Sequence, residues 1–376
     1  MADNNENKVL NVPHLRFPEF SGEWNKYTIN DLATVVGGGT PDTTVKSYWG
    51  GDIQWFTPSE IGKNKYVDFS LRTITRDGLD NSSAKLLPLH TILLSSRATV
   101  GECSIASNEC TTNQGFQSLI AKQCNINIDF LYYLIQTKKK DLIRNACGST
   151  FLEISANEIR KIKVAVPVQN EQEQIAKLLS LIDERIATQN KIIEKLQSLI
   201  KGLAAQLTQS GTPNIRLCDC LECHSSTLQE NCVSVTGSYP VYGATGLIGY
   251  TNNYAYNGES ILIVKDGSGV GSLSYVNDHF SVIGTLNYLT AKENYSILYL
   301  YYALMAFNFT PYITGMAIPH IYFKDYGKAK LFYPSIEKRI RIASLLHNIE
   351  QKLVVEQNLV ISLSAQKSYL LRMLFI

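Results

Sequence analysis

The sequence GSTFLEISANEIRKIKVAVP, residues 148–167, recurs as GMAIPHIYFKDYGKAKLFYP, residues 315–334, and the two stretches align without a gap. Their apolar pattern agrees, although the identical positions of the first copy are only Gly148, Ile154, Lys161, Lys163 and Pro167. Shorter matches occur in the same order: VGECS (100–104) with VGSLS (270–274), QSLIAK (117–122) with NYLTAK (287–292), and LYY (131–133) with LYY (300–302). Similarity at a fixed spacing indicates repeated structural units, so the sequence predicts two related halves.

A heptad pattern follows each of these stretches. Residues recur at alternating steps of four and three, and most of them are apolar, which is typical of a coiled-coil seam. The first seam consists of Ile175, Leu179, Ile182, Ile186, Gln189, Ile193, Leu196, Ile200, Leu203 and Leu207. The second consists of Ile342, Leu346, Ile349, Leu353, Glu356, Val360, Leu363, Lys367, Leu370 and Leu374. Two seams of equal length in one chain predict two long helices that pair antiparallel and hold two globular heads apart.

The starts of both helices carry recognisable signals. Pro167 and Pro334 stand just before the seams, where a fixed φ and a missing N–H are tolerated. We expect Asn170 with Glu173 in the first copy, and Ser335 in the second, to act as N-caps.

Gln189 and Glu356 fall at the same seam position in the two copies. A polar residue at a core position commonly fixes the register of a coiled coil and lowers its stability. Alternatively, the helices diverge at this position and both side chains are solvated.

The globular halves read as α/β or α+β. Residues 91–95 and 260–264 are apolar runs typical of buried strands, and residues 130–135 and 298–307 are helical in pattern. Gly37–Pro41, Asn257–Gly258 and Asp266–Gly269 indicate turns. The predicted architecture is a tail and opening segment (1–23), a first globular domain (24–167), a central helix (168–213), a second globular domain (214–334) and a C-terminal helix (335–376).

Polar loops carry the side chains that suit DNA. Arg and Lys suit phosphates and guanine edges, Asn and Gln suit adenine, and Ser, Thr and Tyr suit either. The first-half candidates are Lys46, Gln54, Thr57, Ser59, Lys63, Arg97, Asn113 and Gln114, with Lys65 as a further loop residue. The second-half candidates are Tyr239, Tyr242, Thr245, Lys265, Ser268, His320 and Lys324, with Tyr250 and Tyr322 as further loop residues. The alternative for each residue is an ordinary solvated loop side chain.

Motifs for chemistry are missing from the sequence. It lacks a phosphate-binding P-loop, a nucleophile elbow and a zinc-protease motif, and no Asn-Pro-Pro-aromatic or Asp-Pro-Pro-aromatic stretch of an amino-methyltransferase occurs. We therefore expect no catalytic residue and no cofactor. The formal net charge of +2 neither requires nor excludes a nucleic-acid partner.

The segment 1–10 is acidic and rich in Asn, and no run of about 18 apolar residues is present, so we expect a cytoplasmic protein with neither a leader nor a membrane span. Free thiols are then expected, because disulfides are rare in reducing compartments. Cys218, Cys220, Cys223 and His224 form a cluster that could hold zinc. Their spacing is poor for a structural zinc site, so we expect no metal and interpret the cysteines as small buried residues.

Several stretches are similar to one protein family. PHLRFPEF (13–20) followed by Trp24 resembles the opening segment of type I restriction-modification specificity subunits, as does GGTP (38–41) leading into YWGGDIQWFTPSEI (48–61). YPVYGATGLIGY (239–250) is similar to another common opening of a target-recognition domain, and EQEQIA (171–176) resembles the start of the family's central helix. The second half departs from the pattern, because its opening segment, NIRLCDCL (214–221), lacks the tryptophan.

The resemblance implies two target-recognition domains joined by two antiparallel helices with pseudo-twofold symmetry. It implies double-stranded DNA as the ligand, with each domain reading one half of a split site. It also implies two methyltransferase subunits as partners, optionally joined by two restriction-translocase subunits. The helices would set the distance between the half-sites and dock the methyltransferase subunits.

Two other functions are compatible with parts of this sequence. One is a coiled-coil scaffold that tethers two protein-binding heads and never touches DNA; salt-sensitive binding to mixed duplex DNA would distinguish it from a DNA reader. The other is a solitary methyltransferase, which would bind the methyl donor without a partner.

Overall fold

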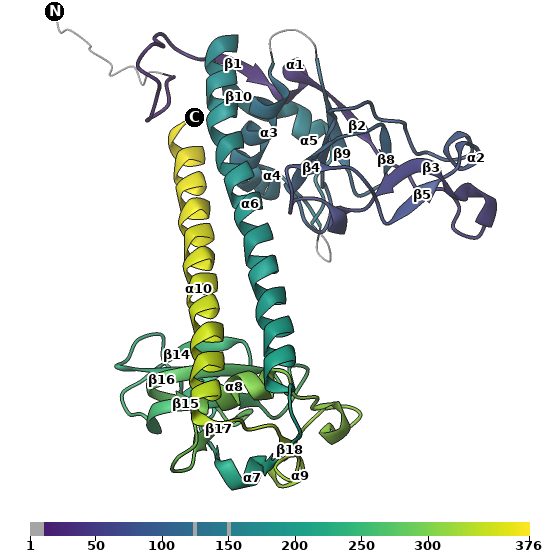
Figure 1. Ribbon diagram of the computed structural model, residues 1–376. Coiled ribbons are helices and arrows are strands. Elements are labelled where there is room, and N and C mark those ends of the chain that lie inside the picture. The colour runs from purple at the N-terminus through teal and green to yellow at the C-terminus, as the bar shows by residue number, and fades with distance from the viewer. Residues whose placement is uncertain (1–10, 123–125, 149–151) are drawn as a thin grey trace, which may run out of the picture. The chain divides into compact units, whose positions relative to one another are not determined.

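The structure is a computed structural model that describes residues 11–122, 126–148 and 152–376. The tail expected over residues 1–10 and the thiol of Cys124 lie outside the described residues. The chain divides into two compact units, the first formed by Met1–Thr188 with Val360–Ile376 and the second by Gln189–Leu359. Two long helices, α6 (Gln169–Thr208) and α10 (Ile336–Met373), each contribute a segment to both units (Figure 1). The expected mixed α/β fold with two long helices is confirmed.

The first unit contains three sheets. Its five-stranded sheet has the order β2 (Ala33–Gly37), β9 (Gln117–Ala121), β6 (Ile92–Leu94), β7 (Cys103–Ala106) and β4 (Tyr66–Val67). Its three-stranded sheet has the order β5 (Arg72–Ile74), β3 (Trp49–Phe56) and β8 (Cys110–Thr112), and β1 (Asn25–Thr28) forms a ribbon with β10 (Lys163–Val166). The helices are α1 (Ile29–Leu32), α2 (Arg76–Asp80), α3 (Ile128–Thr137), α4 (Lys139–Arg144) and α5 (Ala156–Lys161), with 3-10 turns η1 (Lys46–Tyr48) and η2 (Pro58–Glu60).

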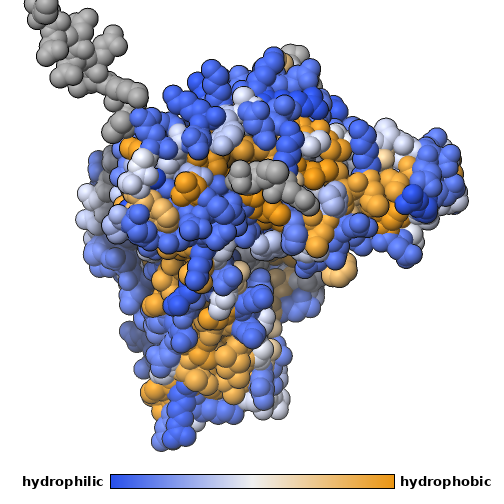
Figure 2. Space-filling model, turned by 90° about the horizontal axis from the view of Figure 1, so that it is seen from above, coloured by the Kyte–Doolittle hydropathy of each residue, from blue (hydrophilic) through white to orange (hydrophobic). Residues whose placement is uncertain are grey.

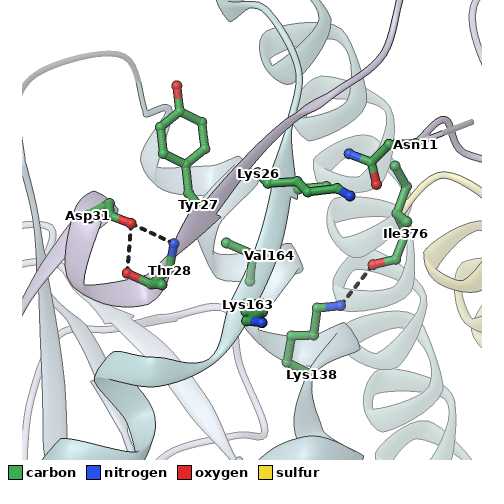
Figure 3. A pocket seen from close by; sticks show the side chains of 10 residues that line it. Asn11, Lys26, Tyr27, Thr28, Asp31, Lys138, Lys163, Val164 and Ile376 are labelled. Atoms are coloured by element: carbon green, nitrogen blue, oxygen red, sulfur yellow. Dashed lines mark hydrogen bonds between the residues drawn. The ribbon is translucent and has the colours of Figure 1, made fainter.

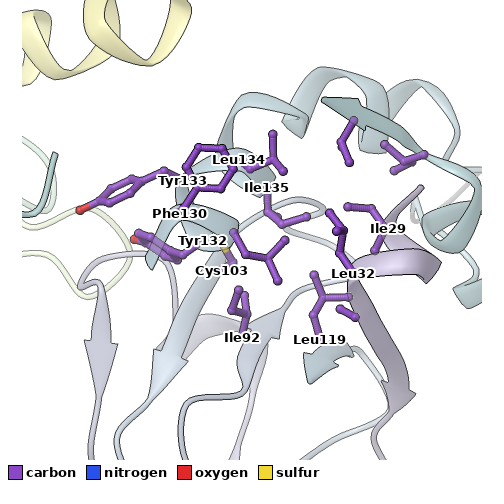
Figure 4. Close-up of a cluster of buried hydrophobic side chains, with 14 of the residues drawn as sticks. Ile29, Leu32, Ile92, Cys103, Leu119, Phe130, Tyr132, Tyr133, Leu134 and Ile135 are labelled. Atoms are coloured by element: carbon purple, nitrogen blue, oxygen red, sulfur yellow. The ribbon is translucent and has the colours of Figure 1, made fainter. Parts of the chain in front are cut away.

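Helix α3 forms the centre of the first core. The side chain of Asn127 caps it by accepting a 2.9 Å hydrogen bond from the Phe130 amide. Its apolar residues from Phe130 to Ile135 are almost fully buried and pack against side chains of the five-stranded sheet, including Ile92 and Leu119 (Figure 4). Each such buried side chain contributes about 1.5–3 kcal/mol, so this helix fixes the sheet to the rest of the unit.

The second unit is built around one six-stranded sheet. The order is β12 (Leu221–Ser225), β17 (Leu286–Ala291), β15 (Tyr256–Val264), β16 (Leu273–Val282), β13 (Tyr239–Gly243) and β14 (Gly246–Thr251). A short ribbon pairs β11 (Ile215–Arg216) with β18 (Lys330–Leu331). The remaining elements are α7 (Leu217–Cys220), α8 (Ile297–Met305), α9 (Phe323–Tyr326), η3 (Glu230–Cys232) and η4 (Thr310–Tyr312).

The turn expected at Asn257–Gly258 is wrong. Both residues lie inside β15 and pair with His279 and Asp278 of β16. Gly258 adopts a φ of 133°, which only glycine tolerates readily. Gly258 therefore allows an unusual backbone conformation within β15, and hydrogen bonding to β16 keeps both residues in the strand.

In each unit, segments of the two long helices pair antiparallel. In the first unit, Lys367 Nζ lies 2.6 Å from Asp183 Oδ1, and Leu374 packs in the same core as Ile175. In the second unit, Gln189 hydrogen-bonds to Glu356, and Lys338 Nζ lies 3.2 Å from Ser210 Oγ. Residue numbers rise along one helix as they fall along the other. Every seam position of both helices is buried or half-buried, whereas most intervening residues are exposed.

One expected helix cap differs from the structure. Helix α6 begins at Gln169, so Asn170 lies within its first turn. The amides of Glu171 and Gln172 donate to the carbonyl oxygen of Val168, at 3.0 and 3.1 Å, which makes Val168 the capping position. In the second copy, the Arg339 amide donates to the carbonyl of Ser335 at 3.0 Å, so Ser335 occupies the expected place before α10.

Buried polar contacts fix each globular part to its long helix. In the first unit, Tyr133 of α3 donates a 2.7 Å hydrogen bond to Asp183 of α6. In the second unit, Tyr302 of α8 donates a 2.6 Å hydrogen bond to Glu350 of α10. Asp183 and Glu350 are 167 residues apart, which is the offset of the aligned stretches 148–167 and 315–334. The repeat therefore extends from the sequence to the contacts between head and helix.

The opening segment is attached to the start of α6. Arg16 donates two 2.8 Å hydrogen bonds to Glu171, one from Nε and one from Nη2, and Trp24 Nε1 donates a third at 3.3 Å. Glu171 is fully buried, so this carboxylate requires these donors. The arginine and tryptophan of the opening segment thus have a structural role.

Candidate nucleic-acid interface

Some of the candidate DNA-binding residues of the first half lie close together, around the end of strand β6. The amide of Ser96 donates to the Gly115 carbonyl at 2.8 Å, and the Ser96 carbonyl accepts from the Ile154 amide at 2.9 Å. A pocket of about 250 Å³ opens here, and its lining residues are Pro58, Arg97, Ala98, Asn113, Gln114 and Gly115. We call this place the first junction. It brings together Arg97, Asn113 and Gln114.

Two glycines allow the loops of the first junction to approach one another. A Cβ on Gly38 would lie 2.0 Å from the carbonyl oxygen of Asn113, and a Cβ on Gly39 would lie 2.3 Å from the backbone of Ser83. Neither position tolerates a side chain without movement of the backbone. Thr40 follows directly, and its hydroxyl donates to the side-chain oxygen of Gln114. The glycine pair thus permits the close approach of the loops, and the Thr40 hydroxyl holds the side-chain amide of Gln114.

The side chains of the first junction are well suited to reading polar edges. The guanidinium of Arg97 lies 3.9 Å from Glu153 and is about half exposed. Asn113 Oδ1 accepts a 2.9 Å hydrogen bond from the Gly115 amide, which orients its amide nitrogen away from that contact. Arginine recognises guanine and amide side chains recognise adenine in the major groove.

The other first-half candidates lie elsewhere or have internal partners. Gln54 Oε1 accepts from Ser70, at 2.7 Å from the amide and 3.0 Å from the hydroxyl. Thr57 donates a 2.6 Å hydrogen bond to Glu60 and lies 3.0 Å from the Ser59 hydroxyl, next to Pro58 of the junction. Lys46 lies in η1, which packs on α2, and Lys63 lies in the exposed loop before β4. Neither lysine lines the junction pocket.

Lys65, a further loop residue, is engaged within the first unit. Its ammonium lies 2.8 Å from Asp129 and donates a 2.6 Å hydrogen bond to Ser180 of α6. It also lies 4.9 Å from the centre of the Tyr133 ring. These contacts give Lys65 a role in joining the head to the helix.

The second unit builds the same junction at the end of strand β15. The Lys265 amide donates to the Thr285 carbonyl at 2.9 Å, and the Lys265 carbonyl accepts from the Ile321 amide at 2.9 Å. Ser96 and Lys265 are therefore equivalent, and so are Ile154 and Ile321. The bridge between Asp266 and His320 brings His320 next to Lys265 at this second junction, and Ser268 lies in the turn that follows.

The following residues complete the match between the two junctions. Ala98 has a φ of 64° and its amide donates to the Leu152 carbonyl at 3.3 Å. Gly267 has a φ of 98° and its amide donates to the Pro319 carbonyl at 2.9 Å. Ala98 is not a glycine, so its left-handed conformation is strained. The same main-chain path occurs in both units.

Lys324 lies close to the second junction. Its ammonium lies 5.1 Å from the centre of the Tyr322 ring, and the Tyr322 ring contacts His320 edge-on at 5.0 Å. Aromatic and cationic groups therefore stand together on the segment that follows the junction.

The remaining second-half candidates lie along β13. Tyr239 packs against Tyr254 and His279, with ring centres 4.9 and 5.5 Å apart. Tyr242 packs against Phe280, and burial raises the pKa of its phenol. Thr245 is exposed in the turn between β13 and β14, and Tyr250 is half-buried in β14. Tyr242 is linked to the second junction through Ile283–Thr285, since its carbonyl accepts from the Ile283 amide at 3.0 Å.

The cysteine and histidine cluster has other partners. Cys220 Sγ lies 3.4 Å from the carbonyl oxygen of Arg216, and His224 Nε2 lies 2.9 Å from the Thr290 hydroxyl. No set of three metal-ligating side chains occurs within the described residues. Burial raises the pKa of Cys220, and of Cys103 and Cys110 in the first unit, to about 12. These thiols are therefore protonated and unreactive at neutral pH.

Sequence reasoning missed Thr40 and Glu153 at the first junction. Thr40 positions Gln114, and Glu153 pairs with Arg97. The Gly-Gly-Thr-Pro signal marked Thr40 as a turn residue, but its partner is 74 residues away. For Glu153, the internal repeat is the available signal, because its counterpart is the candidate residue His320.

The face of the molecule drawn in Figure 2 is largely hydrophilic with apolar patches. Single apolar side chains are normal on a surface. In the second unit, however, Met316 is fully exposed and Ile318 is 65% exposed on the segment that ends at His320. Among the described helices, none has the length and apolar character needed to span a membrane.

Comparison with known proteins identifies relatives over almost the whole chain. The family model described as the type I restriction modification DNA specificity domain matches residues 21–198 and again residues 215–363. The MjaIX specificity subunit of Methanocaldococcus jannaschii is 39% identical over 184 residues, which cover 46% of this chain and 42% of that relative. The EcoprrI specificity subunit of Escherichia coli is 25% identical over 361 residues, which cover 87% of each chain.

A solved structure shares the fold. The S subunit of a type I restriction-modification system from M. genitalium superposes with a TM-score of 0.65 at 19% identity, covering 97% of this chain and 99% of that one. The two family matches coincide with the two halves of the internal repeat. The chain belongs to the family of DNA specificity subunits of type I restriction-modification systems.

Proposed function

We propose that this chain reads a split DNA site on behalf of a type I restriction-modification complex. The domain over residues 24–167 reads one half-site and the domain over residues 214–334 reads the other. The helices over residues 168–213 and 335–376 set the unspecified spacer and dock the methyltransferase subunits. Double-stranded DNA is the ligand, and the chain carries no cofactor.

The equivalence of the two junctions is the observation that carries this proposal. Both have the same main-chain hydrogen bonds, but they present different side chains at matched positions. In the first unit Arg97 forms an isolated β-bridge with Glu153, and in the second unit Asp266 forms the equivalent bridge with His320. Arg97 therefore corresponds to Asp266, and Glu153 corresponds to His320. Ser96 corresponds to Lys265. Because sequence is read by side chains at base edges, one scaffold with two side-chain sets favours two different half-sites.

The long helices support a protein partner. Leu181 and Leu199 of α6 and Leu345, Val355 and Ile361 of α10 are between 46% and 67% exposed. Single apolar side chains are normal on a surface, but their recurrence along both helices outside the seam favours contact with another protein. We propose two methyltransferase subunits as that partner, with two restriction-translocase subunits as optional further components.

Catalysis is assigned to the partner subunits. The proposal is supported by the side chains at the two junctions, which are hydrogen-bonding groups suited to recognition. Its direct test is incubation of the purified chain, free of partners, with labelled methyl donor and duplex DNA. Methyl transfer that copurifies with this polypeptide contradicts a recognition role without catalysis.

A domain exchange tests the division of labour. Residues 24–167 are replaced by the matching domain of another specificity subunit, chosen to carry a tryptophan at the position of Trp24, so that Glu171 keeps this donor together with Arg16, which lies outside the exchanged segment. Methylome sequencing of cells that express the hybrid with its partner subunits then shows a change in one half of the methylated site. A change in both halves contradicts independent recognition domains. The reciprocal exchange of residues 214–334 is the matched control.

A further inference from the structure

The two-stranded ribbon β1–β10 of the first unit carries two lysines on one face. In the antiparallel pair β1–β10, Lys26 stands opposite Ala165, and Thr28 stands opposite Lys163. Residues that face each other, and residues two apart on one strand, point to the same side of a sheet. Lys26 and Lys163 are therefore diagonal neighbours on one face. Both are exposed, while the alternate residues Val164 and Val166 are buried in the core.

These lysines line a pocket of about 570 Å³ (Figure 3). Lys138 also lines it and donates a 2.8 Å hydrogen bond to the main-chain oxygen of Ile376. The acid of the pocket, Asp31, accepts hydrogen bonds of 2.7 Å from the amide and from the hydroxyl of Thr28. Lys138 and Asp31 therefore have partners. Lys26 and Lys163 form no ion pair with a carboxylate of the described residues.

The second unit repeats this arrangement with a different pair. In the ribbon β11–β18, Arg216 stands directly opposite Lys330. Both side chains are exposed, and neither is ion-paired within the part of the chain that the structure describes. Like charges directly opposite each other destabilise a sheet. The pair Arg216 and Lys330, and the diagonal pair Lys26 and Lys163 at a longer distance, therefore lower the stability of the fold unless an anion binds between the two cations.

The internal repeat preserves this feature. Of the twenty aligned positions in residues 148–167 and 315–334, the identical ones include Lys163 with its counterpart Lys330. The other identical positions have structural roles or an acidic partner. Gly148 and Gly315 have positive φ, Ile154 and Ile321 belong to the junctions, and the prolines precede the helices. Lys161, which aligns with Lys328, pairs with Glu158 at 2.8 Å. A lysine that neither packs in a core nor pairs with an acid is retained although the recognition side chains have diverged. Its ligand is therefore common to both halves.

We propose that each ribbon binds a phosphate of the DNA backbone, at Lys26 and Lys163 in the first unit and at Arg216 and Lys330 in the second. This inference rests on the proposed function in DNA recognition. Phosphates are identical in both half-sites, whereas the bases differ. Lysine and arginine neutralise DNA phosphates, and three of the four cations are lysines, which are depleted in protein–protein interfaces. The composition of the ribbons thus favours DNA over an acidic protein surface.

The test uses the full chain and the double variant Lys163→Gln/Lys330→Gln. Its matched control is Lys177→Gln/Lys201→Gln, which removes one exposed lysine of α6 from each unit and the same total charge. Affinity is measured as a function of salt for a duplex that contains the methylated site and for an unrelated duplex. We expect the ribbon variant to bind both duplexes more weakly by a similar factor. The slope of log Kd against log salt should fall by about 0.9 for each lost phosphate contact.

The outcomes separate this inference from the proposed function. If the wild-type chain prefers its own site but the ribbon variant has the same salt slope as the control, the inference of phosphate sites is overturned and the proposed function is not. A ribbon variant that binds DNA normally but no longer assembles with methyltransferase subunits also overturns them, in favour of a protein ligand. Wild-type chain that shows no site preference contradicts the proposed function itself. The melting temperature checks that the ribbon variant is folded. It should not be lower than that of wild type, because each substitution relieves repulsion between two cations.

Discussion

Gln189 donates a hydrogen bond from Nε2 to Oε2 of Glu356, and the two residues occupy the same seam position of the two repeated helices. Gln189 is only 4% exposed. Lys352 Nζ lies 3.9 Å from the other carboxylate oxygen of Glu356. The helices therefore do not diverge at this position with both side chains solvated. Instead, the amide of Gln189 and the carboxylate of Glu356 hydrogen-bond to each other within the seam.

Replacing the pair with leucine should raise stability. A buried polar pair exchanged for apolar side chains of similar volume is often neutral or stabilising by about 1–4 kcal/mol. We expect Gln189→Leu/Glu356→Leu to unfold at equal or higher urea concentration than wild type. Glu356→Leu alone should be less stable than the double variant, because it leaves the amide of Gln189 without its acceptor. Equilibrium unfolding of all four combinations measures the coupling, and additive effects would contradict it.

The tyrosine that joins α8 to α10 should be needed for stability in the second unit. Tyr302 Oη lies 2.6 Å from Glu350, and Tyr301 Oη lies 2.9 Å from the same carboxylate. Tyr302→Phe removes one donor from a charged acceptor and should lower the free energy of unfolding by about 1–3 kcal/mol. Tyr254→Phe is the control, since that ring is about half exposed. Equal unfolding midpoints for the two variants would show that the contact contributes nothing.

Alkaline pH should destabilise the second unit. Burial raises the pKa of Tyr299 to about 12, and its hydroxyl donates a 2.8 Å hydrogen bond to the Phe332 carbonyl. The unfolded chain loses this proton near pH 10. The protonated phenol of Tyr299 therefore contributes fully to the free energy of unfolding below about pH 10. This contribution, roughly 2–3 kcal/mol, is lost as the pH rises toward 12. Urea midpoints measured between pH 8 and 11.5 should fall, and Tyr299→Phe should flatten the decline. A parallel decline in the variant would exclude Tyr299 as its source.

The sequence predicts most of the architecture because the architecture depends on periodic patterns. The heptad seams and the repeat require only regular spacing of apolar residues, and both appear in the structure with the expected helices. Helix α3 spans Ile128–Thr137 where residues 130–135 predict it, and β6 spans Ile92–Leu94 inside the predicted run 91–95. These elements carry their determinants within a few neighbouring residues.

The candidate site was harder to predict because its parts are distant in sequence. Arg97 and Glu153 meet although 56 residues separate them, and Thr40 meets Gln114 across 74. Composition also does not distinguish Lys65, which lies against Tyr133 and Asp129, from the exposed Lys63 two residues before it. Whether a polar side chain faces DNA or an internal partner depends on tertiary contacts that no local pattern encodes.

Arg97 and Lys265 should affect DNA binding in different ways. Arg97 lines the first junction with Gln114, whereas the main chain of Lys265 holds the second junction and its side chain is half-buried. Arg97→Ala should weaken binding to the methylated site by about 1–3 kcal/mol and relax one position of one half-site, as expected for a lost base contact. Lys265→Ala should affect only the other half-site. Binding to duplexes with single substitutions in each half measures both effects. Unchanged affinity and salt slope in both variants would remove these residues from the interface.

The helices should set the spacer between the half-sites. Helix rise is about 1.5 Å per residue, so one added heptad lengthens a helix by about 10 Å. This length corresponds to roughly three base pairs, and it rotates one half-site by about a third of a turn. A matched insertion must keep the polar pair together. Heptads inserted after Gln189 and after Val355 meet this condition, because Gln189 and Glu356 then stay on the same side of both insertions.

We expect the matched variant to methylate sites whose spacer is about two to four base pairs longer, with both half-site sequences unchanged. Heptads inserted after Gln189 and after Glu356 provide the control. They add the same length, but they separate the two polar residues by one heptad and leave each opposite an apolar seam residue, so this variant should be the less stable. Methylome sequencing reads the spacer of whatever methylation survives the rotation. An unchanged spacer in the folded, active matched variant would mean that the helices join the recognition domains without measuring the distance between their targets.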